Sequence, residues 1–170
     1  DPSDAAFVEN FAAFLVGQGV LDELSKHRAQ RAQLQSGERF DLVLTRLGLV
    51  SEVDMARQLA EFLGLPWIDP RDLPETPLLA DRLQLPFLVS NRIIPVSENG
   101  ETVRLAVADP FNTDPAAAVG YLLSRPIECG IMPAAEIERA LERLYGRGDK
   151  TAADAGSPEP GQASEDDVRR

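Results

Sequence analysis

Residues 39–69 read RFDLVLTRLGLVSEVDMARQLAEFLGLPWID, a pattern that predicts two short helices followed by a strand. Apolar side chains recur at helical spacing in both predicted helices, at Phe40, Val43, Leu44 and Leu47 and then at Met55, Leu59, Phe62 and Leu63. Gly48 ends the first helix, because glycine readily takes the left-handed conformation of a C′ residue. Ser51 is a typical N-cap for the second helix. Gly64 and Pro66 mark the end of that helix.

The same plan occurs 29 residues earlier in the chain. Asn10 and Phe11 align with Arg39 and Phe40, and residues 19–23 (GVLDE) align with residues 48–52 (GLVSE). This alignment indicates an internal repeat of about one helical hairpin. A single hairpin cannot bury its apolar face, so we expect the two hairpins to pack into a bundle of about four helices over residues 1–65.

Beyond Pro66 the pattern changes to short strands and helices. Three prolines between residues 70 and 77 predict an extended linker, with a short helix at residues 77–83 and another helical turn at residues 86–90. Strands are predicted at residues 93–96, 103–107 and 126–131, and helices from Pro115 to about Leu123 and over residues 134–145. The Asn99-Gly100 pair predicts a tight hairpin in which both residues take positive φ.

The predicted fold class is α+β, with three parts. Residues 1–65 form the helical repeat bundle, and residues 66–146 form a small α/β subdomain with a β-hairpin and a mixed sheet. Residues 147–170 contain glycine, proline and charged residues with almost no large apolar side chains, which is typical of a disordered tail or linker.

Composition excludes several function classes. The 170-residue chain has a formal net charge of -11 and a pI near 4.5, which argues against binding a nucleic acid backbone. No apolar run approaches the roughly 18 residues needed to span a bilayer, and the N-terminus does not resemble a signal peptide, so we expect a cytosolic protein without membrane insertion. Cys129 is the single cysteine, which excludes an intramolecular disulfide and favours a buried strand cysteine.

We find no catalytic constellation. The sequence has no phosphate-binding loop, no nucleophile elbow and no cluster of histidine and cysteine ligands, and His27 is the only histidine. We therefore predict neither catalytic residues nor a metal site. The Ala108-Asp109-Pro110 segment allows an active-site aspartate, but Asp-Pro is ordinary turn chemistry and a strand-ending turn is favoured.

Several ordered motifs nevertheless resemble one family. RLGLVSEVDMARQLAEFLGLPWID, PFLVSNRIIPV, VRLAVADPFN and IERALERLYG follow one another as they do in the N-terminal region of the type II secretion ATPase and its type IV pilus assembly relatives. The resemblance covers residues 7–146. Residues 164–170 (SEDDVRR) resemble the acidic lead-in to the ATPase module, so we expect the chain to stop before the catalytic part, where ATP and magnesium would bind.

The resemblance implies a non-catalytic docking domain. In this family the region is similar to a module that recruits the hexameric ATPase to the cytoplasmic part of an inner-membrane platform protein. It implies a cytoplasmic location, peripheral to the inner membrane through that partner, and a monomer or weak dimer for this chain. A third interpretation, an independent enzyme, would need a convergent polar pocket, for which we find no residues.

The helical repeat also resembles a cyclic di-GMP receptor module whose motifs begin Arg-x-Gly and end in glutamine. Arg39 matches the arginine and is the candidate nucleotide-binding residue, but Asp41 stands at the glycine position and Phe62 at the glutamine position. In the first repeat Asn10 and Ala12 replace the arginine and the glycine. A carboxylate repels a phosphate diester, so the resemblance leaves nucleotide binding as the alternative function.

The first helix is the predicted docking surface. It carries more large apolar side chains than one buried stripe requires, at Phe7, Val8, Phe11 and Phe14. We therefore expect an exposed apolar face that a protein partner covers.

Overall fold

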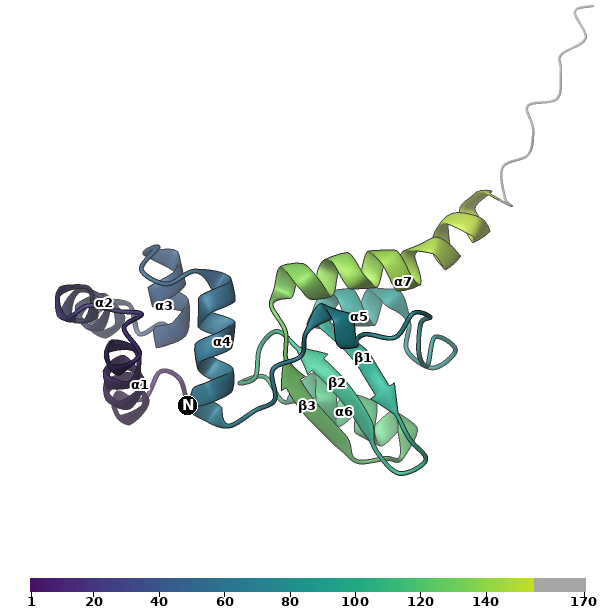
Figure 1. The fold of residues 1–170 in the computed structure, drawn as a ribbon, viewed down its shortest axis with the longest axis horizontal. Helices are drawn as coiled ribbons and strands as arrows, with labels where there is room; N and C mark the ends of the chain where they lie inside the picture. The colour runs from purple at the N-terminus through teal and green to yellow at the C-terminus, as the bar shows by residue number, and fades with distance from the viewer. Residues whose placement is uncertain (155–170) are drawn as a thin grey trace, which may run out of the picture.

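The computed structural model describes the backbone of residues 1–154 and the side chains of residues 1–146. In this part of the chain, seven α-helices and a three-stranded mixed sheet form two lobes (Figure 1). The predicted α+β class is confirmed. The last helix continues to Asp154 instead of ending near Tyr145, and residues 155–170 of the predicted tail lie outside the described residues.

The first lobe is the predicted four-helix unit. Its helices are α1 (Ala5–Gly17), α2 (Glu23–Ser36), α3 (Phe40–Arg46) and α4 (Glu52–Leu63). Asp22 caps α2 and Ser51 caps α4, each accepting a hydrogen bond from the backbone N–H three residues later, at 2.7 and 3.1 Å. Gly19 and Gly48 follow α1 and α3 with φ of 72° and 70°. The internal repeat is thus present in the backbone at the predicted 29-residue spacing.

The core of this lobe comes from equivalent positions of the two hairpins. Phe11 and Leu15 of α1 and Phe40 and Leu44 of α3 are all fully buried. Each such side chain contributes roughly 1.5–3 kcal/mol through removal of its apolar surface from water. The repeat therefore supplies matching halves of one core, as the alignment predicts.

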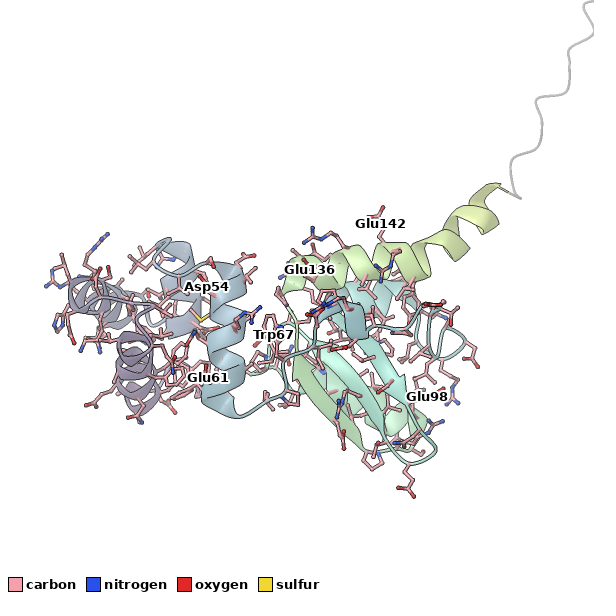
Figure 2. All side chains as sticks on the ribbon, viewed as in Figure 1. Asp54, Glu61, Trp67, Glu98, Glu136 and Glu142 are labelled. Carbon is pink, nitrogen blue, oxygen red and sulfur yellow. The ribbon has the colours of Figure 1, made fainter. Side chains whose placement is uncertain are left out.

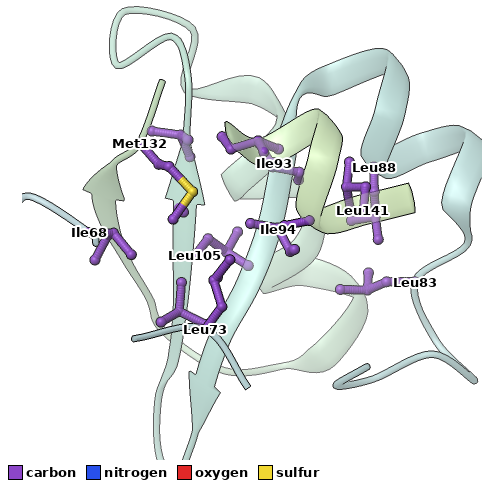
Figure 3. Close-up of a cluster of buried hydrophobic side chains, with 14 of the residues drawn as sticks. Ile68, Leu73, Leu83, Leu88, Ile93, Ile94, Leu105, Met132 and Leu141 are labelled. Carbon is purple, nitrogen blue, oxygen red and sulfur yellow. The ribbon is translucent and has the colours of Figure 1, made fainter. Parts of the chain in front are cut away.

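The second lobe contains the sheet. Its elements are the 3-10 helix η1 (Pro70–Asp72), α5 (Leu85–Asn91), β1 (Ile93–Glu98), β2 (Val103–Val107), α6 (Asp114–Leu123), β3 (Ile127–Ile131) and α7 (Ala134–Asp154). β1 pairs antiparallel with β2, and β2 pairs parallel with β3. The crossover connection from β2 to β3 contains α6. Apolar side chains from the sheet and from α5, α6 and α7 form one core cluster (Figure 3).

Two local predictions are corrected. The β1–β2 hairpin forms, but neither Asn99 nor Gly100 takes positive φ. Instead the Asn99 side chain accepts hydrogen bonds from the backbone N–H groups of Glu101 and Thr102, at 2.8 and 2.7 Å, and this Asx turn closes a longer loop. Residues 77–83 form turns with Leu79 at a φ of 55°, so the helix predicted there is wrong.

The lobes are joined by the chain that leaves α4. The backbone N–H of Ile68 donates to the carbonyl of Ile131 at 2.9 Å, and the N–H of Ile131 donates to the carbonyl of Pro66 at 2.8 Å. Ile131 also packs in the core cluster of the helical lobe. Trp67 lies between the lobes (Figure 2), with the guanidinium of Arg57 4.6 Å from its ring centre.

Candidate functional site

Arg39 connects the two lobes. It is the residue immediately before α3, and its guanidinium donates two hydrogen bonds to Asp41, at 2.8 and 3.2 Å. Two further hydrogen bonds, at 2.7 and 3.0 Å, reach Asp109 in the segment after β2. The planar fork of a guanidinium suits such bidentate pairing with carboxylates. One side chain therefore joins a helix of the first lobe to the sheet of the second.

This ion-pair cluster is partly shielded from water. The Asp41 side chain is only 6% exposed and that of Arg39 is 25% exposed. Burial opposes the charge of Arg39, but hydrogen bonds to Asp109 and Asp41 raise its pKa above the ordinary arginine value. Burial likewise opposes ionisation of Asp109, but hydrogen bonds from Arg39 and from the Phe111 backbone lower its pKa overall. The pair is charged at neutral pH.

Phe111 adds a second contact between the lobes. The guanidinium carbon of Arg39 lies 5.0 Å from the centre of the Phe111 ring, within the range of a cation–π interaction. The same ring meets Phe7 of α1 edge to face, with 5.4 Å between ring centres. The segment after β2 thus gives the helical lobe both a carboxylate and an aromatic ring.

The predicted docking residues lie in an aromatic cluster instead of on an exposed face. Val8 is 7% exposed and Phe11 is fully buried, so these two of the four predicted docking residues do not contribute to an exposed apolar face. Phe7 and Phe14 are half-buried, and both rings contact Phe62 of α4, with centres 5.9 and 5.2 Å apart. The additional large side chains on α1 pack against α4 and Phe111, contacts that the pattern of one helix does not reveal.

The positions that depart from the nucleotide-binding pattern have structural roles. Ala12 is fully buried, and Asp41 neutralises Arg39. Phe62 lies 5.1 Å from Phe11, ring centre to ring centre. The Arg39 side chain is 25% exposed, and its guanidinium already donates to two carboxylates.

A cleft of about 740 Å³ opens beside the Arg39 cluster. The first lobe lines it with residues of α3 and α4, and the second lobe lines it with α5, the segment after β2 and the start of α7. Arg92 and Glu138, both in the cleft wall, form an ion pair of 3.4 Å. A ligand in this cleft would contact both lobes.

Sequence reasoning missed the functional pairing of Asp109. The predicted strand-ending turn is confirmed, since the Phe111 N–H donates to the Asp109 carboxylate at 3.0 Å. The ion pair with Arg39 spans 70 positions, and no local pattern signals it. Gln33 was missed as well: it is 6% exposed and donates to the carbonyl of Glu38, which fixes the turn before Arg39.

Within the described residues, no group of three or more His, Cys, Asp or Glu side chains is placed to hold a metal ion. No helix in the same part of the chain is both long enough and apolar enough to cross a membrane.

Comparison with protein families gives a match to the MshEN domain over residues 63–151, about half of the chain. The chain belongs to the MshEN domain family. It is 38% identical to type II secretion system protein E of Xanthomonas campestris over 125 residues. This alignment covers 71% of the chain and 22% of that protein. It is 24% identical over 131 residues to the type IV pilus assembly ATPase PilB of Myxococcus xanthus, covering 77% of this chain and 23% of PilB. The chain thus spans about a fifth of each curated relative.

Solved structures extend the likeness to both lobes. The N-terminal domain of XpsE has a TM-score of 0.64 at 34% identity, covering 82% of this chain and 96% of that domain. A structure of MshE with cyclic di-GMP has a TM-score of 0.62 at 27% identity, covering 79% of this chain and 98% of that one. The chain corresponds to the N-terminal, non-catalytic domain of secretion ATPases.

Proposed function

We propose that this MshEN domain docks a type II secretion ATPase to the cytoplasmic part of an inner-membrane platform protein. The observation that carries the proposal is the 38% identity to type II secretion system protein E, together with the likeness to the isolated N-terminal domain of XpsE. ATP and magnesium would bind in a separate catalytic part of a hexameric parent. The domain would be cytoplasmic and held at the inner membrane only through its partner.

The two-lobed structure suits a docking role. The lobes meet through the Arg39–Asp109 ion pair, the Phe7–Phe111 contact and the packing of Ile131 in the core of the helical lobe. The two lobes are therefore already held together before a partner binds. A partner that contacts both lobes would not have to bring them together, which lowers the cost of binding. Of the docking residues predicted on α1, only Phe7 and Phe14 retain exposed surface for such a partner.

Localisation in cells tests this proposal. A fluorescently tagged copy of the chain is expressed in a bacterium with a type II secretion system, with the platform gene present or deleted. We expect signal at the cell periphery only when the platform protein is present. Peripheral signal that persists in the deletion strain would contradict recruitment by that partner.

Binding of cyclic di-GMP is the second candidate function. It is favoured by the 27% identity to MshE, which was solved with cyclic di-GMP, and by Arg39 at the arginine position of the receptor motif. Asp41 and Asp109 oppose it, because each already accepts two hydrogen bonds from the guanidinium. A phosphate would have to displace carboxylates that carry the same sign of charge.

Calorimetric titration with cyclic di-GMP separates these candidates. We expect no saturable heat for the wild-type chain, since Arg39 is neutralised. In Asp41→Gly the glycine of the receptor motif is restored and one competing carboxylate is removed, so any weak binding should strengthen in this variant. Saturable binding by the wild type that is lost in Arg39→Ala would establish the nucleotide function instead.

A further inference from the structure

The cleft between the lobes has an excess of negative charge. Four carboxylates line it, those of Asp41, Glu52, Asp109 and Glu138, against the guanidiniums of Arg39 and Arg92, for a net formal charge of -2. Both guanidiniums are already paired with cleft carboxylates. Among the described side chains, Glu52 has no cationic partner within ion-pair distance. The cleft therefore attracts a cation and repels an anion.

The same cleft presents exposed apolar side chains from both lobes. Leu42 of α3 is 49% exposed and Val89 of α5 is 47% exposed. Beneath them the apolar side chains of Met55 and Leu59 on α4 are buried and form part of the lining. Aliphatic groups exposed beside carboxylates provide a contact surface for a chain that carries both apolar and basic residues.

The volume also fits a segment of polypeptide. At about 740 Å³ the cleft falls within the range of roughly 300–1,000 Å³ that is typical of ligand sites. Ser90 and Asn112 add side chains that can hydrogen-bond to a peptide backbone. The site thus combines apolar contacts, unpaired negative charge and polar groups, the features that amphipathic peptide segments recognise.

We propose that the interlobe cleft binds a basic amphipathic segment of a partner protein. Aliphatic side chains of the segment pack on Leu42 and Val89, and its lysine or arginine side chains lie beside Glu52 and the Arg39 cluster. This inference goes beyond the proposed function, because it concerns the chemistry of the bound segment. It holds whether or not the platform protein supplies that segment.

A synthetic probe tests the proposal without any natural partner. The probe is a short fluorescein-labelled peptide of leucine and lysine, with leucine at i, i+3 and i+4 spacing, and its binding is followed by fluorescence anisotropy. A peptide of the same composition in scrambled order is the control for amphipathicity. We expect the patterned peptide to bind more tightly than the scrambled one, with affinity that falls as salt is raised.

Two matched pairs of variants locate the binding site. Glu52→Lys should weaken binding about fivefold more than Asp54→Lys, a change of equal charge in the same turn of α4 but outside the cleft. Leu42→Ser should weaken binding about tenfold more than Leu34→Ser, which lies on α2 and is 82% exposed. All four side chains are exposed, so the variants should fold, and circular dichroism verifies this.

The matched design separates a site from general attraction to an acidic protein. Equal loss of affinity within each pair would show that overall charge holds the peptide, and would overturn the proposal. Absence of binding by the wild type would overturn it as well. Failure of the platform protein to bind would contradict the docking function only, because the probe does not derive from that protein.

Discussion

At the scale of single residues, Asp109 is the group whose ionisation ties the lobes together. Burial opposes its charge, but hydrogen bonds from Arg39 and Phe111 lower its pKa overall. A carboxyl with a depressed pKa in the folded state contributes stability above its unfolded pKa of about 3.9, and this contribution is lost as the pH falls through the folded pKa. Acid should therefore weaken the contact between the lobes.

Asp109→Asn tests this contribution. The amide oxygen can still accept from the Phe111 N–H, so the turn is retained while the charge is removed. We predict a loss of about 1 kcal/mol in unfolding free energy at neutral pH, because the carboxylate is partly exposed. Urea denaturation at a series of pH values should show a shallower decline below about pH 4 in the variant. Identical pH dependence of the two proteins would contradict this role.

Tyr145 is a second residue with a testable pH signature. Its hydroxyl donates to the Leu78 carbonyl at 2.6 Å, and burial raises the pKa of Tyr145 to about 12. A raised pKa stabilises the fold below the unfolded value of about 10, and this stability is lost as the pH rises through the folded value. We predict that Tyr145→Phe costs about 1 kcal/mol at neutral pH and flattens the decline above about pH 10. Denaturant unfolding measures both effects, and unchanged stability would contradict the hydrogen bond.

At the scale of elements, the segment after α4 packs closely against β3 at Gly130. A Cβ at Gly130 would lie 2.5 Å from the Ile68 side chain and 3.0 Å from the Pro66 carbonyl oxygen. We predict that Gly130→Ala costs about 1–3 kcal/mol through overpacking. It should also change the fluorescence of Trp67, the only tryptophan in the chain, which lies in this segment.

Gly100→Ala is the matched control for this prediction. An added Cβ there meets nothing within 4 Å, and its backbone does not need positive φ. Its unfolding free energy should stay within about 0.5 kcal/mol of the wild type. Equal stability of the two variants, measured by denaturant unfolding, would show that the Gly130 contact is not tight.

The elements that sequence predicted well are those encoded locally. The repeat, the N-cap Ser51 and the glycine after α3 depend on residues a few positions apart, and all are present. The helix predicted at residues 77–83 did not form, and Asn99 closes its loop through its side chain instead of positive φ. The same turn residues are compatible with several local conformations, and tertiary packing selects one of them.

The candidate site was harder to predict because it is built from distant segments. Arg39 was singled out through the resemblance, but its pairing with Asp109 and its contact with Phe111 join residues about 70 positions apart. The same reason explains the error at Phe11. An excess of apolar side chains on one helix predicts contacts, but not whether another protein or another part of the same chain supplies them.

At the scale of the whole molecule, the structure has two lobes (Figure 1). An acidic cleft lies between them. Ion pairing, aromatic packing and the burial of Ile131 in the core of the helical lobe all cross the junction. The MshEN family and the likeness to the XpsE domain indicate a regulatory or docking role within secretion ATPases. Our central claim is that this domain binds the cytoplasmic part of a platform protein.

Calorimetric titration of the purified chain with the cytoplasmic domain of the cognate platform protein tests that claim most directly. We predict saturable binding at a fixed stoichiometry, with no requirement for ATP because the domain itself is non-catalytic. Absence of saturable heat at every concentration reached, with both proteins folded by circular dichroism, would contradict the claim.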